Sequence, residues 1–321
     1  MEFPVELKSL CEKLVEGISG NEMVESAKEL SRRYMSESGT GKSLLNSDKD
    51  AIVYSLMRMP ATFGAVASAL EQICATSDFV PRTLLDAGAG TGAGSWAASA
   101  FFNLDCITCL EREKAMENIG KSLMKDADEP VLNEAQWIHT DLSVDFAGKY
   151  PSDLVIASYV LNEMSEEDRM ETVEKLWSNT KEILLIVEPG TPVGYRNIRA
   201  IREYFVKQGA YIAAPCTHSD ECPVTGDDWC HFTCRVQRGR LHKMAKVADV
   251  PYEDEKFAYI ALSRVKCQNP TGRIMRHPII EKGRIRLTVC TDEGKIEEKS
   301  VTKKEGEIFK RAKKKSCGDF I

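Results

Sequence analysis

Apolar residues recur at helical spacing through the first eighty residues. Leu7, Leu10, Leu14 and Ile18 follow one another at intervals of three and four residues, which is the period of an amphipathic helix. We find no stretch there with the two-residue period of a β-strand. The pattern therefore predicts an N-terminal helical extension over residues 1–80.

From residue 81 onward, short apolar runs alternate with helical segments. The predicted strands are Thr83–Asp86, Cys106–Leu110, Ala135–His139, Asp153–Tyr159, Glu182–Val187 and Phe257–Arg264. This alternation is typical of an α/β fold with a doubly wound, mainly parallel sheet, which we expect over residues 81–265. Residues 210–246 are rich in Cys, His and Arg and show no regular period. We expect this segment to be a metal-binding insertion.

The last part of the chain differs in both pattern and charge. Short apolar runs separated by Gly283 and Asp292–Gly294 predict a small β module over residues 266–321. Residues 264–321 hold 16 Lys/Arg and 8 Asp/Glu, although the whole chain has a net charge of −6. A basic module on an acidic body suggests contact with RNA, and a solvated lysine-rich tail is the alternative. The predicted RNA-binding residues are Arg235, Arg238, Lys313, Lys314 and Lys315.

Composition narrows the class of protein. No run approaches the roughly 20 apolar residues that cross a bilayer, and four glutamates among the first 19 residues argue against a secretory signal. Eleven cysteines in such a chain favour metal binding over a disulfide framework. We expect a cytoplasmic, monomeric protein without membrane contact.

A glycine-rich loop follows the first predicted strand. The run from Asp86 to Gly92 places glycines at 88, 90 and 92 just before a helical segment, where free N–H groups can approach a ligand closely. Two kinds of site use such a loop. The G-x-G-x-x-G/A pattern of dinucleotide folds is satisfied by Gly88, Gly90 and Ala93. The acid-x-G-x-G-x-G pattern of S-adenosylmethionine (SAM) enzymes is satisfied as well, and Glu111 fits the ribose-binding acid of either fold.

Later residues favour the SAM site. Asp141 follows the third strand, where SAM enzymes commonly bind the adenine amino group, and the second nucleotide-binding half of a dehydrogenase is missing. The predicted cofactor-binding residues are Asp86, Gly88, Gly90, Gly92, Glu111 and Asp141. No catalytic residue identifies itself, because Ser158–Glu163 stands where amino-group methylases carry an Asn/Asp-Pro-Pro-aromatic run. Asn162 and Glu163 either line a substrate pocket or begin a helix.

Four cysteines lie within nineteen residues, at 216, 222, 230 and 234. Thiolates select zinc, copper(I) or iron–sulfur clusters, and zinc modules usually space their cysteines two to four residues apart. The first two intervals here are longer, which suits loops around a bulky cluster. Cys290 is a candidate fourth ligand from the β module. Spacing alone leaves iron–sulfur and zinc open.

Several blocks of sequence together resemble the methyltransferase-like proteins of the small ribosomal subunit. They are Tyr54 with Arg58–Thr62, Leu85–Trp96, Ser158–Glu163, Leu185–Gly194, Ala214–Arg238, Phe257–Arg264 and Ala312–Asp319. The resemblance implies a class I SAM-methyltransferase fold and binding to small-subunit rRNA during ribosome assembly. It also implies a [4Fe-4S] cluster held by Cys216, Cys222, Cys230 and Cys290.

The resemblance leaves three roles open for the protein. One is a SAM-dependent rRNA methyltransferase, and another is a catalytically inactive rRNA-binding assembly factor with a structural cluster. A redox-sensing regulator is the third, and it would require a labile or exposed cluster.

Overall fold

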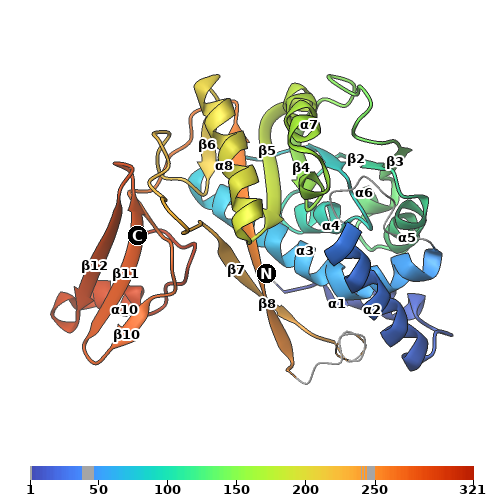
Figure 1. Ribbon diagram of the computed structural model, residues 1–321, viewed down its shortest axis with the longest axis horizontal. Helices are drawn as coiled ribbons and strands as arrows, with labels where there is room; N and C mark the ends of the chain where they lie inside the picture. Colours follow the sequence, from blue (N-terminus) through green and yellow to red (C-terminus); the bar gives the residue numbers. More distant parts are fainter. Residues whose placement is uncertain (1, 38–46, 240, 242, 244–249) are drawn as a thin grey trace.

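The computed structural model describes residues 2–37, 47–239, 241, 243 and 250–321. Its larger part is an eight-stranded sheet with helices on both faces (Figure 1). The strands of this main sheet are β1 (Thr83–Ala87), β2 (Cys106–Glu111), β3 (Gln136–His139), β4 (Ser152–Ser158), β5 (Thr180–Pro189), β6 (Tyr211–Ala214), β7 (Phe232–Gln237) and β8 (Tyr252–Ser263).

The strand order of the main sheet is β3-β2-β1-β4-β5-β8-β6, with β7 also paired to β8. The first five strands are parallel to one another. Strand β8 runs antiparallel to β5, β6 and β7. This order, with one antiparallel strand between the fifth and sixth, is that of the class I SAM-methyltransferase fold. The mainly parallel α/β sheet predicted from the sequence is confirmed.

Helices cover both faces of the main sheet. They are α3 (Asp48–Thr76), α4 (Ala93–Ser99), α5 (Lys114–Lys125), α6 (Pro130–Asn133), α7 (Glu166–Asn179) and α8 (Pro192–Lys207). Helices α1 (Val5–Leu14) and α2 (Gly20–Glu37) pack on the outside of α3. The cores on the two faces use alternate residues of each strand: Ile183 and Leu185 of β5 join the core beneath α3 and α4, whereas Leu184 joins the core beneath α7 and α8. Because both faces are buried, the strands read as continuous apolar runs.

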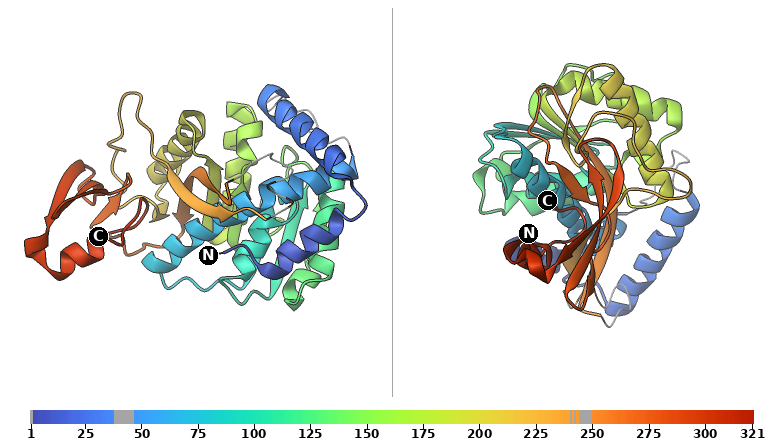
Figure 2. Two further views of the ribbon diagram at one scale, coloured as in Figure 1. Left: turned by 90° about the horizontal axis from the view of Figure 1, so that it is seen from below. Right: turned by 90° about the vertical axis from the view of Figure 1, so that its left-hand side faces the viewer.

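A second, four-stranded sheet stands at one end of the molecule (Figures 1 and 2). Its elements are β9 (Gly272–Ile274), β10 (Ile279–Glu281), β11 (Arg284–Thr291), β12 (Ile296–Thr302) and α10 (Glu307–Ala312). All its pairings are antiparallel, and its small core includes Ile285, Val289 and Phe309. The loop between β6 and β7 reaches this sheet, since the hydroxyl of Thr217 donates to the carbonyl of Thr291 at 2.8 Å. None of the described helices is both long and apolar enough to span a membrane.

The cysteine-rich segment differs from its expected form. We expected residues 210–246 to be a metal-binding insertion, but the segment contributes β6 and β7 to the main sheet. The longest irregular stretch among its described residues is the loop 215–231. Strand β7 alternates apolar Phe232, Cys234 and Val236 with polar residues, but over six positions only, so its signal is weak beside the irregular loop. Residues 240, 242 and 244–246 of this segment lie outside the described part of the chain.

Candidate functional site

The glycine loop joins β1 to α4 in a left-handed backbone path. Gly88, Gly90 and Gly92 have φ angles of 67°, 57° and 88°, a region that disfavours side chains. A Cβ on Gly88 would come within 2.5 Å of Cγ2 of Val160, whereas a Cβ on Gly90 would meet nothing within 4 Å. The absence of a side chain at Gly88 therefore lets Val160 pack against the loop. At Gly90 it leaves an open space, which we call the open cradle, that a ligand can fill.

Asp86 lies beneath this loop and does not line a cavity. Its carboxylate is fully buried and accepts two hydrogen bonds from Ser95, from the backbone N–H and the hydroxyl, each at 2.8 Å. Burial raises the pKa of Asp86 to about 6, although the bonds from Ser95 oppose the shift. Asp86 thus fastens the first turn of α4. Gly92 packs against the side chain of Met124 and is likewise not a lining residue.

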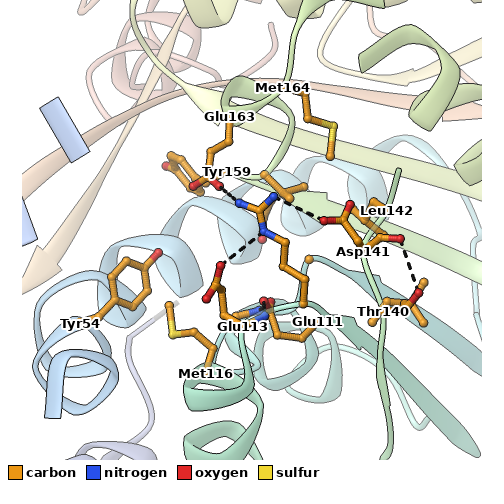
Figure 3. Close-up of a pocket in the computed structure, with 16 residues that line it drawn as sticks. Tyr54, Glu111, Glu113, Met116, Thr140, Asp141, Leu142, Tyr159, Glu163 and Met164 are labelled. Carbon is orange, nitrogen blue, oxygen red and sulfur yellow. Dashed lines mark hydrogen bonds and ion pairs between the residues drawn. The ribbon is translucent and has the colours of Figure 1, made fainter. Parts of the chain in front are cut away.

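The other four predicted cofactor residues meet at one cavity of about 90 Å³, which we call the glycine-loop pocket. Gly88, Gly90, Glu111 and Asp141 line it (Figure 3). It opens at the carboxyl ends of β1, β2, β3 and β4, where open α/β sheets bind their ligands. The sequence did not single out several other lining residues, namely Tyr54, Arg112, Glu113, Met116 and Tyr159.

One arginine crosses the pocket and contacts three carboxylates. The guanidinium nitrogens of Arg112 lie 3.5 Å from Glu113, 3.6 Å from Asp141 and 3.5 Å from Glu163. Figure 3 marks these ion pairs with dashed lines. Glu111 is held separately, because its carboxylate accepts the N–H of Gly90 at 2.7 Å and that of Glu113 at 2.8 Å. The pocket therefore gathers four acids around one base.

The pKa values of these acids are shifted in different directions. Burial raises the pKa of Glu163 to about 7; Arg112 opposes this shift, and the nearby Glu111 and Glu113 add to it. Burial also raises the pKa of Glu111, against the hydrogen bonds from Glu113 and Gly90. Burial acts the same way on Asp141, but hydrogen bonds from Ser143 and the charge of Arg112 outweigh it and lower the pKa. Glu163 therefore has a pKa close to neutral pH.

The segment after β4 closes the pocket. Tyr159 has a φ of 58°, which is rare for a bulky residue and is found most often at functional sites. Its hydroxyl donates to Glu255 at 2.9 Å, and Glu255 also pairs with Arg58 at 3.2 Å. Of the two residues for which the sequence left a choice, Glu163 lines the pocket at the end of a short 3₁₀ turn.

Four cysteines line a second cavity of about 50 Å³, which we call the cysteine cavity. They are Cys216, Cys222, Cys230 and Cys290, the set that the resemblance implies. Cys234 lies elsewhere, with its sulfur against the backbone of Gly64. Among the described residues, no three His, Cys, Asp or Glu side chains converge closely enough to hold a single metal ion.

Three arginines stand among the mainly apolar residues that line the cysteine cavity. Arg202 and Arg273 are 4% and 2% exposed, Arg199 pairs with Glu203 at 2.8 Å, and none of the described lining residues is Asp or Glu. Burial raises the pKa of the Cys290 thiol to about 11, as expected for thiols in an apolar wall with no metal bound. The four cysteines fit a metal group bound by thiolates. The buried arginines favour a group with a net negative charge.

The predicted RNA-binding residues fall into two groups. Arg235 pairs with Asp254 at 2.8 Å, and Arg238 pairs with Glu253 at 2.8 Å, so a phosphate would have to compete with these carboxylates. Lys313 and Lys314 are exposed and Lys315 is partly exposed. None of these three lysines forms an ion pair with a described carboxylate. They follow α10 at the edge of the second sheet.

The chain is similar in sequence to a curated protein. The chain is 26% identical over 289 residues to the human mitochondrial ribosome assembly protein METTL17, covering 84% of this chain. It spans 62% of the length of that relative.

Solved methyltransferases show lower similarity. Magnesium protoporphyrin IX methyltransferase from Synechocystis, solved with bound SAM, is 16% identical with a TM-score of 0.43, and the match covers 74% of this chain and 97% of that one. The plantazolicin methyltransferase in complex with SAH (S-adenosylhomocysteine) is 13% identical with a TM-score of 0.44, covering 77% of this chain and 98% of that one.

A family profile described as mitochondrial small ribosomal subunit Rsm22 matches residues 48–321. This range includes the glycine loop, all four cysteines of the cavity and the second sheet. The chain therefore belongs to the Rsm22 family.

Proposed function

We propose that this protein binds SAM in the glycine-loop pocket, holds an iron–sulfur cluster in the cysteine cavity and binds rRNA of the small ribosomal subunit during assembly. The observation that carries the SAM assignment is the open cradle at Gly90 beside four acids at the carboxyl edge of the sheet. SAM carries a sulfonium and an ammonium group against one carboxylate, so it is a net cation. An acidic pocket complements that charge.

Each lining group has a task that its position supports. The backbone of Gly88–Gly90 can approach the ligand without a side chain in the way. Glu111 already orders this loop through the N–H of Gly90, and its carboxylate is the acceptor for ribose hydroxyls. Asp141, at the end of β3, is the acceptor for the adenine amino group. SAM, when bound, supplies an activated methyl group.

Methyl transfer is a second candidate role, and one observation favours it. Glu163 lines the pocket with a pKa of about 7, which suits a general base at neutral pH. No cysteine lines the glycine-loop pocket in the described part of the chain, so an attack through a covalent cysteine adduct has no nucleophile there. Any transfer would therefore be direct, with Glu163 receiving the proton of the acceptor.

For the metal centre, we propose a [4Fe-4S] cluster, with a single zinc ion as the alternative. Four thiolates around one zinc ion converge on a point. In a [4Fe-4S] cluster each thiolate binds a different iron, so the four sulfurs stand further apart around a shared space. Four cysteines around one cavity match that requirement. We assign Cys216, Cys222, Cys230 and Cys290 as the ligands.

The RNA-binding role rests on the exposed lysines after α10 and on membership of a small-subunit family. Charge reversal of Lys313, Lys314 and Lys315 to Glu is expected to weaken rRNA binding. It should also flatten the salt dependence by roughly 0.7–0.9 log units per decade for each phosphate that the variant no longer neutralises. The control is reversal of Lys207 in α8, which is exposed. Equal salt slopes for the triple variant and the wild type would contradict this assignment.

One experiment separates the binding role from the catalytic role. Calorimetric titration with SAM tests binding, and mass analysis of small-subunit rRNA from a deletion strain then looks for a missing methyl group. SAM binding with a missing methyl group that Glu163→Gln fails to restore supports transfer. Binding with every methyl group still present supports an assembly factor. Absence of SAM binding contradicts the SAM site and with it methyl transfer.

A further inference from the structure

Three arginines line the cysteine cavity, and two of them are buried without a carboxylate in ion-pair contact. Arg202 and Arg273 are 4% and 2% exposed, whereas the third, Arg199, pairs with Glu203 at 2.8 Å. None of the described residues that line the cavity is Asp or Glu. A buried charge without an ion-pair partner is destabilising, so an anionic occupant of the cavity would stabilise both arginines.

Arg202 is fixed in place by the loop that carries the cysteines. From α8 it donates to the carbonyl of His218 at 3.1 Å and to that of Asp220 at 2.6 Å. Its Nε lies 3.4 Å from the sulfur of Cys216. Helix α8 is itself anchored at its start, where Thr191 accepts the N–H of Gly194 at 3.1 Å. This guanidinium is therefore directed at one of the four sulfurs.

Arg273 has hydrogen-bonding capacity left over. From β9, its Nη1 donates to the side chain of Gln72 in α3 and to the carbonyl of Gly318 at 2.6 Å. Its Nε and Nη2 are buried and have no hydrogen-bond partner among the described residues. Burying such donors without a partner is unfavourable. Their presence in the wall of a four-thiol cavity points to an acceptor inside it.

We propose that Arg202 and Arg273 balance the negative charge of the metal–sulfur group held by the four cysteines, and that Arg273 donates its two remaining N–H groups to the sulfur atoms of that group. This inference rests on the proposed iron–sulfur centre. Four thiolates around a core of two positive charges leave two negative charges, which the two guanidiniums match. Neither arginine ligates the metal, and both are positioning residues.

This charge balance has a consequence for redox behaviour. Cluster potentials depend on net charge, on hydrogen bonds to the sulfurs and on solvent exposure. One electron from a dithionite-type reductant lowers the core by one positive charge and leaves the bound group with three negative charges. Two nearby guanidiniums favour that state. Arg202 and Arg273 therefore raise the reduction potential of the cluster.

Arg273 also connects the cavity to the end of the chain. Residues 318–320 pair with β9, through the N–H of Gly318 to Ile274 and the N–H of Ile274 to Asp319, each at 2.8 Å. The guanidinium of Arg273 lies over the ring of Phe320, 5.5 Å from its centroid. A group bound to Arg273 would therefore be linked, through one side chain, to the segment that follows Lys313–Lys315.

The test compares Arg273→Gln, Arg273→Lys and the wild type, all purified anaerobically as full chains. Iron and sulfide are measured first, and a dithionite titration followed by electron paramagnetic resonance then gives the midpoint potential. At the wild-type midpoint, we expect the ratio of reduced to oxidised cluster to fall at least tenfold in Arg273→Gln, which is 59 mV for a one-electron couple. Arg273→Lys restores the charge and should recover most of the shift. The matched control is Arg284→Gln, on β11, where the arginine is half exposed and pairs with Glu281.

The outcomes separate the two proposals. A wild-type protein without iron contradicts the iron–sulfur centre before any variant is compared. If Arg273→Gln keeps its cluster with an unchanged potential, the charge-balancing role is wrong. If Arg273→Gln loses iron, Arg273→Lys must retain it; loss of iron from both variants would show a packing role and overturn the inference.

Discussion

The glycine-loop pocket and the cysteine cavity belong to one fold and gather opposite charges. The pocket sets Glu111, Glu113, Asp141 and Glu163 around the single cation of Arg112. The cavity sets Arg202 and Arg273 around four thiols without a carboxylate. In the pocket the excess charge is partly neutralised from within by Arg112, whereas the charges of the cavity need an occupant to neutralise them. The difference predicts a cationic ligand for the first region and an anionic, metal-bound group for the second.

The largest expected effect comes from removing a ligand of the cysteine cavity. Cys290→Ser should lose iron and sulfide, because β11 then no longer contributes a thiolate to the cluster. Metal-binding energy is folding energy where a site is assembled from separate segments, so rRNA binding should fall with it. Iron and sulfide analysis of anaerobically purified protein measures the loss.

Cys234→Ser is the matched control for that experiment. Cys234 is partly buried like Cys290, but it packs against Gly64 outside the cavity. The Cys234→Ser variant should keep the iron content and the brown colour of the wild type. A brown Cys290→Ser protein with four iron atoms per chain would refute the ligand assignment.

In the glycine-loop pocket, Glu111→Ala should produce the largest loss of SAM affinity. The variant removes both the acceptor for ribose hydroxyls and the partner of the Gly90 N–H. We expect a loss of about 1–3 kcal/mol in binding free energy, as for other buried hydrogen-bonded groups. Calorimetric titration measures it, with Glu129→Ala, at an exposed position, as the control. A titration curve equal to that of the wild type would rule out the proposed site.

Replacing Arg112 should make the glycine-loop pocket more negative and so increase its preference for a cationic ligand. Arg112→Met leaves the pocket acids without their cation, so it should favour SAM over SAH, which lacks the sulfonium charge. We expect the ratio of the two affinities to rise roughly 3–10-fold, as for partly exposed ion pairs worth about 1 kcal/mol. Arg82→Met, which breaks an exposed pair with Asp105, is the control. A ratio that falls would show that Arg112 itself holds the ligand.

The smallest expected effect is a pH dependence of SAM binding. The pKa of Glu163 is raised to about 7, so the group is neutral below that pH and ionised above it. Raising the pH from about 6 to about 8 therefore adds a negative charge to the pocket and should tighten SAM binding a few-fold. Glu163→Gln should remove this dependence. A dependence that persists in the variant would assign it to another group.

The sequence predicted those parts of the fold that depend on local pattern. Strands β1, β2, β4 and β5 were predicted because their burial on both faces produces continuous apolar runs. Strands β6 and β7 were missed, since β6 is only four residues long and the alternation of β7 covers only six residues next to an irregular cysteine-rich loop. Such short strands give a weak signal until their partner strand is known.

The candidate site was predictable only in part, for a similar reason. Glycine spacing located the loop, and the end of the second predicted strand located Glu111. Nothing in the chain around Arg112 indicates that it reaches Glu163, fifty-one residues later. Arg273 reads as a charged residue in a short strand, and its burial appears only once β9, α3 and the chain end are packed together. Contacts between segments far apart in the sequence bring these charged side chains together. The spacing of residues within one segment does not predict such contacts.

The central claim is that the glycine-loop pocket binds cationic SAM and the cysteine cavity holds an anionic cluster. Native mass spectrometry tests it most directly, on anaerobically purified protein with and without SAM. The account predicts one [4Fe-4S] mass increment per chain in both spectra, and one further increment when SAM is added. Cys290→Ser should lose only the cluster increment, and Glu111→Ala only the SAM increment. A chain that carries one zinc ion and no cluster, and that takes up no SAM, would contradict the account in both regions.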